Sequence, residues 1–274
     1  MERLGDCSVL LLQPQEFKLF QAFILAEAGI TLSDKKHTLV QTRLTSRIHQ
    51  LNLTSFIQYY KLIVGKGGAM EAQRAIDLLT TNETYFFREP KHFEMLRELA
   101  KAATAERRGL RVWSAASSSG EEAYSIAMVL DDAQGALPWE VLGSDISARM
   151  LRRARNGHYP DVRTTHLPLH YRRQYCLKGT GVEAGTLLVK PELREKVQFT
   201  HVNLVKPLVD IGTFDVIFLR NVMIYFNLEQ KQQVIARIAT TLKPGGTLMI
   251  GHSESLQGIE SNFQLLAPAI YRLT

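Results

Sequence analysis

Apolar residues recur every three or four positions through the first ninety residues, which is the spacing of a buried helix face. The pattern predicts four helices. The first is opened by Pro14 and ended by Gly29, and the second follows Ser33, which we expect to be its N-cap. Two more helices follow after short loops. Residues 1–80 are therefore predicted to be a compact all-α domain.

The period changes after Pro90, where one more helix is predicted, so residues 81–109 are expected to be a linking segment with a helix. From residue 110 onward, short apolar runs alternate with helical patterns. This alternation predicts a parallel α/β sheet with helices on both faces over residues 110–274. The predicted strands are Leu110–Ala116, Trp139–Ile146, Val197–Leu204, Phe214–Leu219, Thr247–Gly251 and a last one within Phe263–Leu273. The predicted helices are Glu121–Asp132, Ala148–Asn156 and Leu228–Leu242.

Two segments depart from this alternation. Residues 158–196 are basic, contain three glycines and are predicted to be an insert. Lys243–Gly246 has the composition of a tight turn between a helix and a strand. Neither segment contains a repeat or a low-complexity tract, so both are treated as parts of the same domain.

The composition is that of a globular protein, because 45% of the 274 residues are hydrophobic and 22% are charged. These fractions exclude disordered, collagen-like and coiled-coil proteins. The cysteines, Cys7 and Cys176, cannot form a disulfide framework and have no partner at metal-ligand spacing. No apolar run reaches the roughly 18–20 residues of a membrane span, and no export signal is present. We expect a cytoplasmic protein that does not insert into a membrane and has no metal site.

Positive charge is concentrated in one part of the chain. The net charge of +6 is mild and does not by itself indicate nucleic acid. Lys36, Arg43 and Arg47, however, are spaced by seven and four residues, which places them along one helix face. Such a stripe is typical of a solvated surface.

The strand ends contain the candidate chemistry, because ligands of an open parallel sheet bind beyond the carboxyl ends of its strands. These ends carry Ser114–Glu122, Asp145, Asn203 and Arg220–Asn221. The first turn has one glycine and two glutamates where a dinucleotide site needs G-x-G-x-x-G, and glutamates would repel a pyrophosphate.

Asp145 ends the second predicted strand, the position from which an acid bonds ribose hydroxyls. A ribose without a pyrophosphate indicates S-adenosylmethionine. The alternative is that Glu121 and Asp145 only cap the helices that follow them.

Four motifs give a more specific indication. They are Thr80–Glu89 (TTNETYFFRE), Val112–Ala116 with Gly120–Glu122 (VWSAA and GEE), Arg220–Phe226 (RNVMIYF) and Gly251–Glu254 (GHSE). In this order, and over nearly the whole chain, they resemble the chemotaxis receptor methyltransferase family, CheR. Two small departures are Ala123, where relatives often have proline, and Ser118-Ser119, where Ser-Thr is more usual.

The resemblance implies an S-adenosylmethionine-dependent protein-glutamate O-methyltransferase. Its substrates would be glutamate side chains on the cytoplasmic helices of methyl-accepting chemoreceptors, with no nucleic acid as partner. The implied fold is a Rossmann-like methyltransferase sheet with a small β-subdomain insert, preceded by a small all-α domain. In some relatives the β-subdomain binds a peptide at the receptor C-terminus, and whether this copy does so stays open.

The resemblance also implies roles for individual residues. The catalytic pair would be Arg88 and Tyr225, and the basic stripe Lys36, Arg43 and Arg47 would dock the receptor. The residues implied to bind the cofactor are Asn82, Thr84, Arg88, Glu122, Asp145, Asn203, Leu204, Arg220 and Asn221.

The chemistry fits these residue types, because a glutamate carboxylate is ionised at pH 7 and needs no general base to attack a sulfonium methyl. Arg88 can orient that carboxylate through charge-assisted hydrogen bonds. The alternative for Arg88 is an ordinary inter-domain ion pair, and for Tyr225 a half-buried aromatic. His252, Ser253 and Glu254 are neighbours on a strand end and are not expected to form a catalytic triad, so we interpret them as structural or pocket-lining.

Three other functions remain as alternatives. The first is a methyltransferase acting on nucleic acid or a small molecule, although aromatic residues do not interleave with the basic stripe. The second is a non-catalytic signalling module that binds S-adenosylmethionine. The third is a nicotinamide dehydrogenase, which the single glycine of the first turn disfavours.

Overall fold

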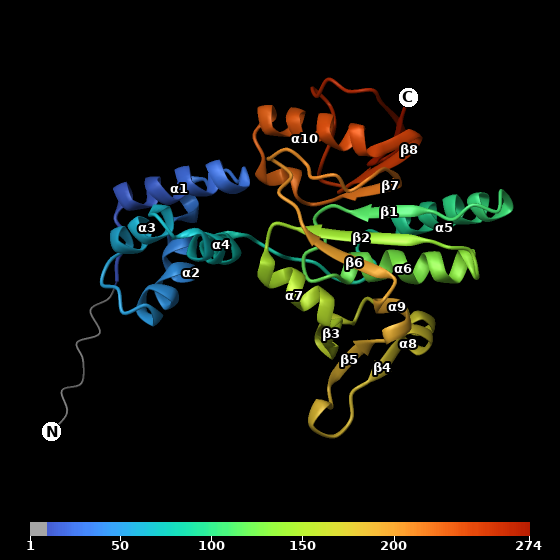
Figure 1. The fold of residues 1–274 in the computed structure, drawn as a ribbon, viewed down its shortest axis with the longest axis horizontal. Helices are drawn as coiled ribbons and strands as arrows, with labels where there is room; N and C mark the ends of the chain where they lie inside the picture. Colours follow the sequence, from blue (N-terminus) through green and yellow to red (C-terminus); the bar gives the residue numbers. More distant parts are fainter. Residues whose placement is uncertain (1–9) are drawn as a thin grey trace. The chain divides into compact units, whose positions relative to one another are not determined.

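The computed structural model describes residues 10–274, and Figure 1 shows their fold. The chain divides into two compact units. Residues 10–81 form the helical unit, and residues 82–274 form the sheet unit. The segment 82–109, expected from the sequence to link two domains, thus belongs to the same unit as the sheet.

Within residues 10–81, four α-helices pack their apolar faces together. Phe20, Leu44 and Tyr59, from three different helices, are fully buried at the centre. Gly29 ends the first helix in the left-handed conformation, with φ +69°, as its position in the sequence predicted. The helices are α1 (Pro14–Ala28), α2 (His37–Gln50), α3 (Phe56–Val64) and α4 (Ala69–Leu79).

Ser33 does not cap the second α-helix, so that prediction is wrong in detail. Asp34–Lys36 form a 3-10 turn (η1) ahead of α2, and Ser33 precedes this turn without a side-chain capping hydrogen bond. The turn runs directly into His37, the first residue of α2. The start of helical structure is therefore where the sequence indicated, but the α-helix begins three residues later.

A seven-stranded sheet with the order β6-β2-β1-β7-β8-β10-β9 forms the centre of the sheet unit. The first five strands in this order run parallel, whereas β10 is antiparallel to both of its neighbours. The strands are β1 (Arg111–Ser114), β2 (Glu140–Asp145), β6 (Val197–His201), β7 (Phe214–Leu219), β8 (Leu242–Ile250), β9 (Phe263–Ala267) and β10 (Ile270–Leu273).

The predicted all-parallel sheet with one final strand is therefore corrected to a mixed sheet that ends in a hairpin. A parallel pair needs a long crossover, usually a helix, and no helix lies between β8 and β10. The chain reverses at Pro268-Ala269, and Ala269 adopts a left-handed φ of +62°.

Helices cover both faces of the sheet (Figure 1). Alternate strand residues point to opposite faces. Val112 and Phe218 pack with α5 and α6 in one core, and their neighbours Trp113 and Leu219 pack with α10 in another. This arrangement confirms the predicted α/β fold class. The helices are α5 (Pro90–Ala105), α6 (Glu121–Gln134), α7 (Ala148–Asn156) and α10 (Leu228–Thr241).

Lys243–Gly246 was predicted as a turn before a strand, and the structure includes it in β8. The register of β8 on β7 shifts between the pairs Phe214–Leu242 and Val216–Thr247. These four residues lie opposite the single residue Asp215 of β7, so β8 has three extra residues within an irregular strand rather than a turn outside it. Gly245 has φ +73°, a conformation that favours glycine.

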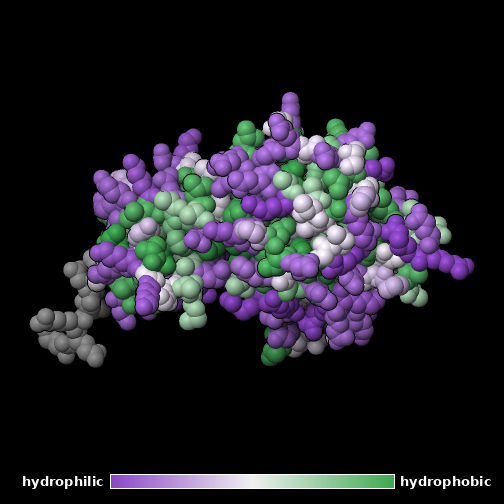
Figure 2. All heavy atoms as spheres, turned by 45° about the horizontal axis from the view of Figure 1, so that its top comes forward, coloured by the Kyte–Doolittle hydropathy of each residue, from purple (hydrophilic) through white to green (hydrophobic). Residues whose placement is uncertain are grey.

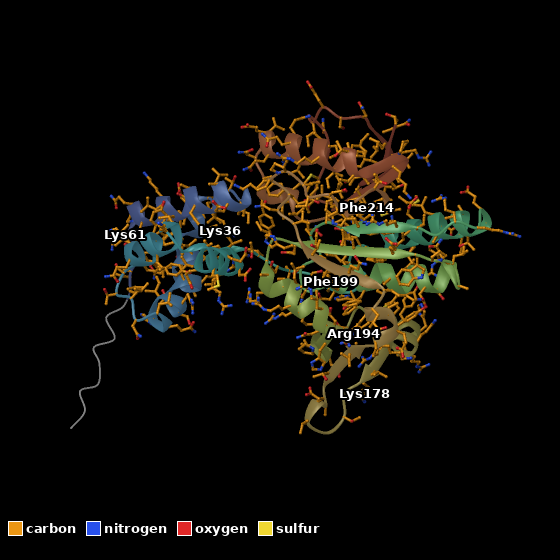
Figure 3. All side chains as sticks on the ribbon, viewed as in Figure 1. Lys36, Lys61, Lys178, Arg194, Phe199 and Phe214 are labelled. Atoms are coloured by element: carbon orange, nitrogen blue, oxygen red, sulfur yellow. The ribbon has the colours of Figure 1, made fainter. Side chains whose placement is uncertain are left out.

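The insert of residues 158–196 forms its own three-stranded antiparallel sheet, in the order β3-β5-β4. We call residues 158–196 the insert subdomain. The resemblance predicted this small β-subdomain, and the two antiparallel strand pairs confirm it. Lys178, labelled in Figure 3, lies in it. Cys176 is buried there, and burial raises the pKa of its thiol to about 12, whereas Cys7 lies outside the described residues. Its elements are β3 (His158–Pro160), η2 (Asp161–Arg163), α8 (Leu169–Tyr175), β4 (Cys176–Lys178), η3 (Gly181–Glu183), β5 (Thr186–Val189) and α9 (Pro191–Arg194).

The surface is of mixed polarity. On the face drawn in Figure 2, hydrophobic residues are interrupted throughout by hydrophilic ones. Among residues 10–274, no helix has both the length and the apolar character that crossing a bilayer would require.

Candidate functional site

The carboxyl ends of β1, β2 and β7 lie side by side, because the three strands are parallel neighbours in the sheet. Ser114, Asp145 and Leu219 are their last residues. We call this region the strand-end site. It contains Ser114–Glu122, Asp145 and Arg220–Asn221, and residues 82–89 lie against it, as the contacts below show.

The turn after β1 has positive φ angles and passes close to α7, and both features favour small residues. Ser118 and Gly120 have positive φ values, +48° and +97°. A Cβ atom on Gly120 would lie only 2.9 Å from the Ala154 Cβ, so a larger residue would push α6 away from α7. The chain therefore enters α6 at close range, with its first-turn glutamates beside the strand ends.

Asp145 holds this turn in place. The Ser118 backbone N–H donates to Asp145 Oδ2 at 2.9 Å, and the Ser147 N–H donates to Oδ1 at 2.8 Å. These two backbone hydrogen bonds fix the position of the carboxylate at the end of β2. The ribose-binding role of Asp145 stays a prediction, and these contacts are compatible with it.

Glu122 and Arg220 form a buried ion pair at the centre of the strand-end site. Arg220 Nη1 lies 3.0 Å from Glu122 Oε2, and the arginine side chain is fully buried. The Ser114 hydroxyl donates to Glu122 Oε1 at 2.8 Å. Burial raises the pKa of the Glu122 carboxyl, and the Arg220 charge opposes that rise. Both predicted cofactor-binding residues are thus preorganised by protein contacts.

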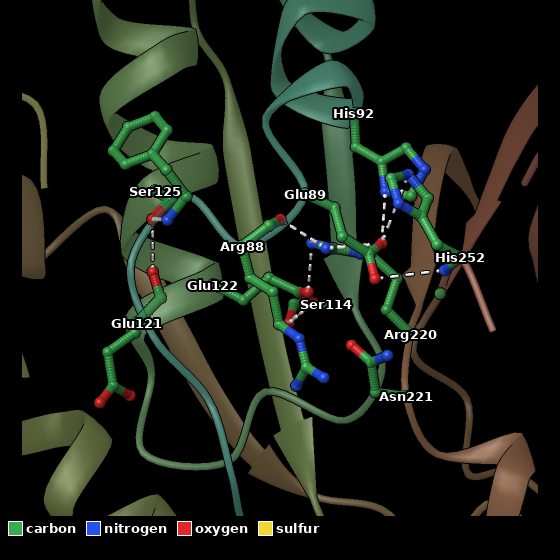
Figure 4. A network of polar contacts seen from close by, with 12 residues as sticks. Arg88, Glu89, His92, Ser114, Glu121, Glu122, Ser125, Arg220, Asn221 and His252 are labelled. Atoms are coloured by element: carbon green, nitrogen blue, oxygen red, sulfur yellow. Dashed lines mark hydrogen bonds and ion pairs between the residues drawn. The ribbon is translucent and has the colours of Figure 1, made fainter. Parts of the chain in front are cut away.

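Arg220 also binds a second acid, Glu89, which the sequence analysis did not single out. Its Nη2 atom lies 2.9 Å from Glu89 Oε2 and donates to the backbone carbonyl of Arg88 (Figure 4). Burial of the Glu89 carboxyl disfavours ionisation, but the Arg220 guanidinium and the backbone N–H of His252 outweigh it and lower its pKa. One buried arginine therefore joins residues 88–89 to α6 and β7.

Arg88 differs from Arg220 in having no carboxylate partner among the described residues. Its Nη1 donates to the Glu83 backbone carbonyl at 3.1 Å, and the guanidinium lies 5.6 Å from the Tyr85 ring centroid. Figure 4 shows the guanidinium extending to the same side as the Asn221 side chain, away from Glu89. These contacts all lie within the sheet unit, so an inter-domain ion pair stays the alternative for Arg88.

The rest of the predicted cofactor-binding set lies around the same edge. The Ser118 hydroxyl donates to the Asn82 carbonyl at 3.1 Å, and Arg163 Nη2 donates to the Thr84 carbonyl at 3.3 Å. These two contacts place residues 82–84 against the first turn and the insert subdomain.

Asn203, Leu204 and Tyr225 were predicted to line the pocket from the segments after β6 and β7. Asn203 Oδ1 accepts the Val205 N–H at 3.2 Å, and Leu204 is buried in the core beneath α10. Tyr225 is half-buried on a short 3-10 turn, η4 (Met223–Tyr225). The contacts of these residues neither require nor oppose the roles that the resemblance implies.

Glu121 is neither a ligand group nor a simple helix cap. Its side chain is fully buried, with Oε1 lying 2.6 Å from Arg163 Nη2 and Oε2 accepting from the Ser119 hydroxyl. Burial raises the pKa of Glu121, and the Arg163 charge opposes this. Tyr159 donates to the Ser119 carbonyl at 2.7 Å. The insert subdomain is thus attached to the first turn, and no local sequence signal reveals the pair because 42 residues separate Glu121 from Arg163 (163 − 121).

Glu254 holds the loop that carries Asn221. Its Oε2 accepts the backbone N–H groups of Asn221 at 2.8 Å and Gly251 at 2.7 Å. Asn221 has φ +56°, and a Cβ on Gly251 would lie 2.6 Å from its side-chain nitrogen. The structural interpretation of the segment after β8 agrees with these contacts.

In the basic stripe of the helical unit, the two arginines are not the freely solvated side chains that the sequence predicted. Arg43 Nη1 donates to the carbonyls of Leu79 and Thr80, at 3.0 Å each. Arg47 forms a forked pair with Glu71, at 2.8 and 2.6 Å, and this hydrogen bonding lowers the pKa of Glu71. Both arginines are half-buried and contact their own unit, whereas Lys36 is exposed at the start of α2 (Figure 3).

Comparisons with known proteins give the same division of the chain. Residues 15–80 match a family model described as CheR methyltransferase, all-alpha domain, and residues 82–271 match one described as CheR methyltransferase, SAM binding domain.

Curated relatives match along both units. The chemotaxis protein methyltransferase of Escherichia coli K12 is 40% identical over 268 residues, covering 97% of this chain and 93% of the relative. That of Salmonella typhimurium LT2 is 39% identical, covering 98% of this chain and 96% of the relative. Chemotaxis protein methyltransferase 2 of Pseudomonas aeruginosa PAO1 is 39% identical, covering 88% and 86%.

Proposed function

This chain belongs to the CheR methyltransferase family, and we propose that it transfers methyl groups from S-adenosylmethionine to glutamate side chains of chemoreceptors, forming glutamyl methyl esters. Its cofactor is S-adenosylmethionine, bound by the sheet unit. The shared name of the relatives supports the chemotaxis setting. The unpaired guanidinium of Arg88 supports a carboxylate as the acceptor.

The strand-end site fits this cofactor better than a nucleotide diphosphate. Glu122 and Asp145 place two acids at adjacent strand ends, which favours hydroxyl and cationic groups and disfavours phosphates. When bound, S-adenosylmethionine supplies a methyl group on a positively charged sulfur. We assign Asp145 to the ribose hydroxyls and Glu122 to the amino-acid end, with Asn82, Thr84, Arg220 and Asn221 around them and Asn203 and Leu204 beside the adenine.

The proposal that the methyl acceptor is a carboxylate depends on Arg88. A guanidinium that is half-buried, extends to the side of Asn221 and forms no salt bridge in the sheet unit is suited to bind a carboxylate from a substrate. Arg220, by contrast, already has two carboxylates. Because a tight arginine pair would reduce the nucleophilicity of the substrate carboxylate, Arg88 orients it, and Tyr225 shapes the space around the methyl group.

The protein needs no general base for this reaction. A glutamate carboxylate is ionised at pH 7, so its oxygen can attack directly once it is aligned. The protein's contributions are alignment and exclusion of water, since the reaction neutralises two opposite charges. The buried residues Ser114, Glu122 and Arg220 provide such a preorganised environment at one wall of the pocket.

The receptor contacts are proposed on two surfaces. Lys36, exposed in the η1 turn of the helical unit, is available to an acidic methylation helix, and Arg43 and Arg47 follow it in α2. In the insert subdomain, β4 is an edge strand with an exposed Leu177, so a receptor peptide can extend this sheet by one strand.

A labelled-methyl assay tests the proposed function. Incubation of the protein with methyl-labelled S-adenosylmethionine and isolated receptor cytoplasmic fragments should give label that is released by mild alkali, as a carboxyl ester requires. Alkali-stable label, or label transferred to RNA instead, would assign another acceptor. Cofactor binding without any transfer would identify a non-catalytic module.

A further inference from the structure

Three side chains with metal-binding atoms meet beside the Glu89–Arg220 pair. Glu89 precedes α5, His92 lies in the first turn of α5, and His252 follows β8. Their ligating atoms all lie within 4.8 Å of one another. Figure 4 shows the two imidazoles next to each other beside the Glu89 carboxylate. Residues separated by 160 positions (252 − 92) are thus brought to one point in the fold.

His92 is the unusual member of this cluster. Its side chain is fully buried, and neither ring nitrogen has a hydrogen-bond partner among the described residues. A buried polar group without a partner is destabilising, so such groups are rare without a compensating ligand. A neutral imidazole carries one N–H and one nitrogen with a lone pair, and that lone pair can bind a metal ion.

The spacing of the three groups suits a metal ion. Glu89 Oε2 lies 3.4 Å from His92 Nδ1 and 3.9 Å from His252 Nε2. Ligands at zinc distances in a tetrahedral arrangement are separated by roughly 3.3–3.4 Å. Only His252 would need to move closer, and its side chain is 49% exposed.

We propose that Glu89, His92 and His252 bind a divalent transition-metal ion of the zinc type. Two imidazoles and one carboxylate form a common ligand set for Zn²⁺, and a fourth position stays open to water on the His252 side. A surface cavity lined by Lys91, Met95 and His252 gives an ion access to this side.

Arg220 is the feature that opposes a cation here, because its Nη2 atom lies 2.9 Å from Glu89 Oε2. Oε2 is also the oxygen whose distances to both histidines suit an ion, so a bound ion would share this oxygen with Arg220 through its two lone pairs. The guanidinium then acts as a second-shell group that fixes the carboxylate, a common arrangement around metal ligands.

Metal titration of the intact chain tests this site without any methyl-transfer measurement. The protein is stripped with a chelator, dialysed and titrated with Zn²⁺ by calorimetry, and Co²⁺ is used as a spectroscopic probe of histidine ligation. We expect one saturable equivalent. His252→Ala, a substitution of a half-exposed side chain, should weaken it at least about tenfold, since even outer-shell partners contribute that much. His49→Ala, which removes an exposed histidine of the helical unit, should leave it unchanged.

Two results would overturn the metal site. One is an absence of saturable Zn²⁺ uptake by the unmodified chain. The other is equal uptake and equal Co²⁺ absorption in the unmodified chain and His252→Ala, because ions bound elsewhere would not respond to that substitution. Neither result bears on the proposed methyl transfer, which depends on Arg88 and the strand-end site.

Discussion

The arginines of the helical unit and those of the strand-end site differ in what their guanidinium groups bind. Arg47 holds one acid, Glu71, at a half-exposed position. Arg220 holds two acids and is completely buried. Arg88, a neighbour of that buried pair, holds none among the described residues. Paired arginines thus support the architecture, and Arg88, which forms no salt bridge in the sheet unit, is the arginine that we propose to contact a substrate.

The largest effect should come from removing the buried arginine. In Arg220→Met, the carboxylates of Glu89 and Glu122 lose their shared partner while they stay buried. Breaking a buried pair costs about 3–5 kcal/mol, so urea unfolding should show a loss of that size. Neutralising one acid as well, in Arg220→Met with Glu122→Gln, should recover part of it. A loss below about 1 kcal/mol would show that the pair is solvated.

Arg88→Ala should lower the rate of methyl transfer and leave stability almost unchanged, in contrast to Arg220→Met. Because Arg88 forms no salt bridge and the buried Glu122, which also feels its charge, keeps Arg220 as its partner, the free energy of unfolding should change little. Methyl transfer to receptor fragments should fall about 10²-fold, a typical cost for one electrostatic contact to a reacting group. Arg152→Ala, on the exposed face of α7, is the matched control for both measurements. A stability loss like that of Arg220→Met would make Arg88 a structural residue.

His92 should make the sheet unit sensitive to acid. Its pKa of about 4 in the folded chain lies below the ordinary 6.5, so between these values the unfolded chain binds the proton and the folded one does not. Stability is therefore present above pH 6.5 and is lost as the pH falls toward 4. Between pH 7 and 5, urea unfolding of the unmodified chain should lose about 2 kcal/mol more than His92→Gln. Its charged neighbours are Arg220, Glu89 and His252.

The exposed His49 supplies the control for this pH series. His49→Ala should show the same loss between pH 7 and 5 as the unmodified chain, because it removes an exposed side chain of the helical unit and leaves His92 in place. Equal slopes for the unmodified chain and His92→Gln would show instead that the His92 ring accepts its proton in the folded state.

The smallest effect is expected on the basic stripe. Charge reversal at Arg43 and Arg47 should slow receptor methylation without changing cofactor affinity, as predicted from the sequence. Reversal at Arg47 would, however, also place a like charge beside Glu71.

Lys36→Glu is the cleaner variant for docking, because Lys36 is exposed. Its methylation rate should fall about two- to fivefold at low salt, and the difference should shrink as salt screens the charge. Lys18→Glu changes the net charge equally on an exposed position of α1 and should leave the rate unchanged. Equal rates for Lys36→Glu and Lys18→Glu at low salt would remove the stripe from receptor docking.

Local patterns predicted much of this fold because they report local physics. The helix ending at Gly29 and the alternation of strands and helices follow from backbone preferences and burial periodicity within a few residues. The same patterns could not distinguish a parallel last strand from the β9–β10 hairpin, since both look like apolar runs. The direction of a strand depends on the connection before it and on the sheet edge it meets.

The candidate site shows the same limit. The motifs that contain Glu122, Asp145, Arg220 and Asn221 are visible in the sequence, and the parallel sheet predicts that they converge. Glu89 lies in one of these motifs, yet only the structure shows its carboxylate on Arg220. Arg163, from the insert, has no motif at all and still reaches Glu121.

By itself, then, the sequence determined the order of the elements, the family and the residue types at the strand ends, because these depend on short-range periodicity and on motifs. The tertiary structure alone decided which charges are paired: Arg220 with two glutamates, Arg47 with Glu71, and Arg88 with no carboxylate among residues 10–274. It also brought His92 and His252 beside Glu89. Ion pairs and ligand clusters act over a few ångströms in space, and positions far apart in the chain reach that range only when the sheet assembles.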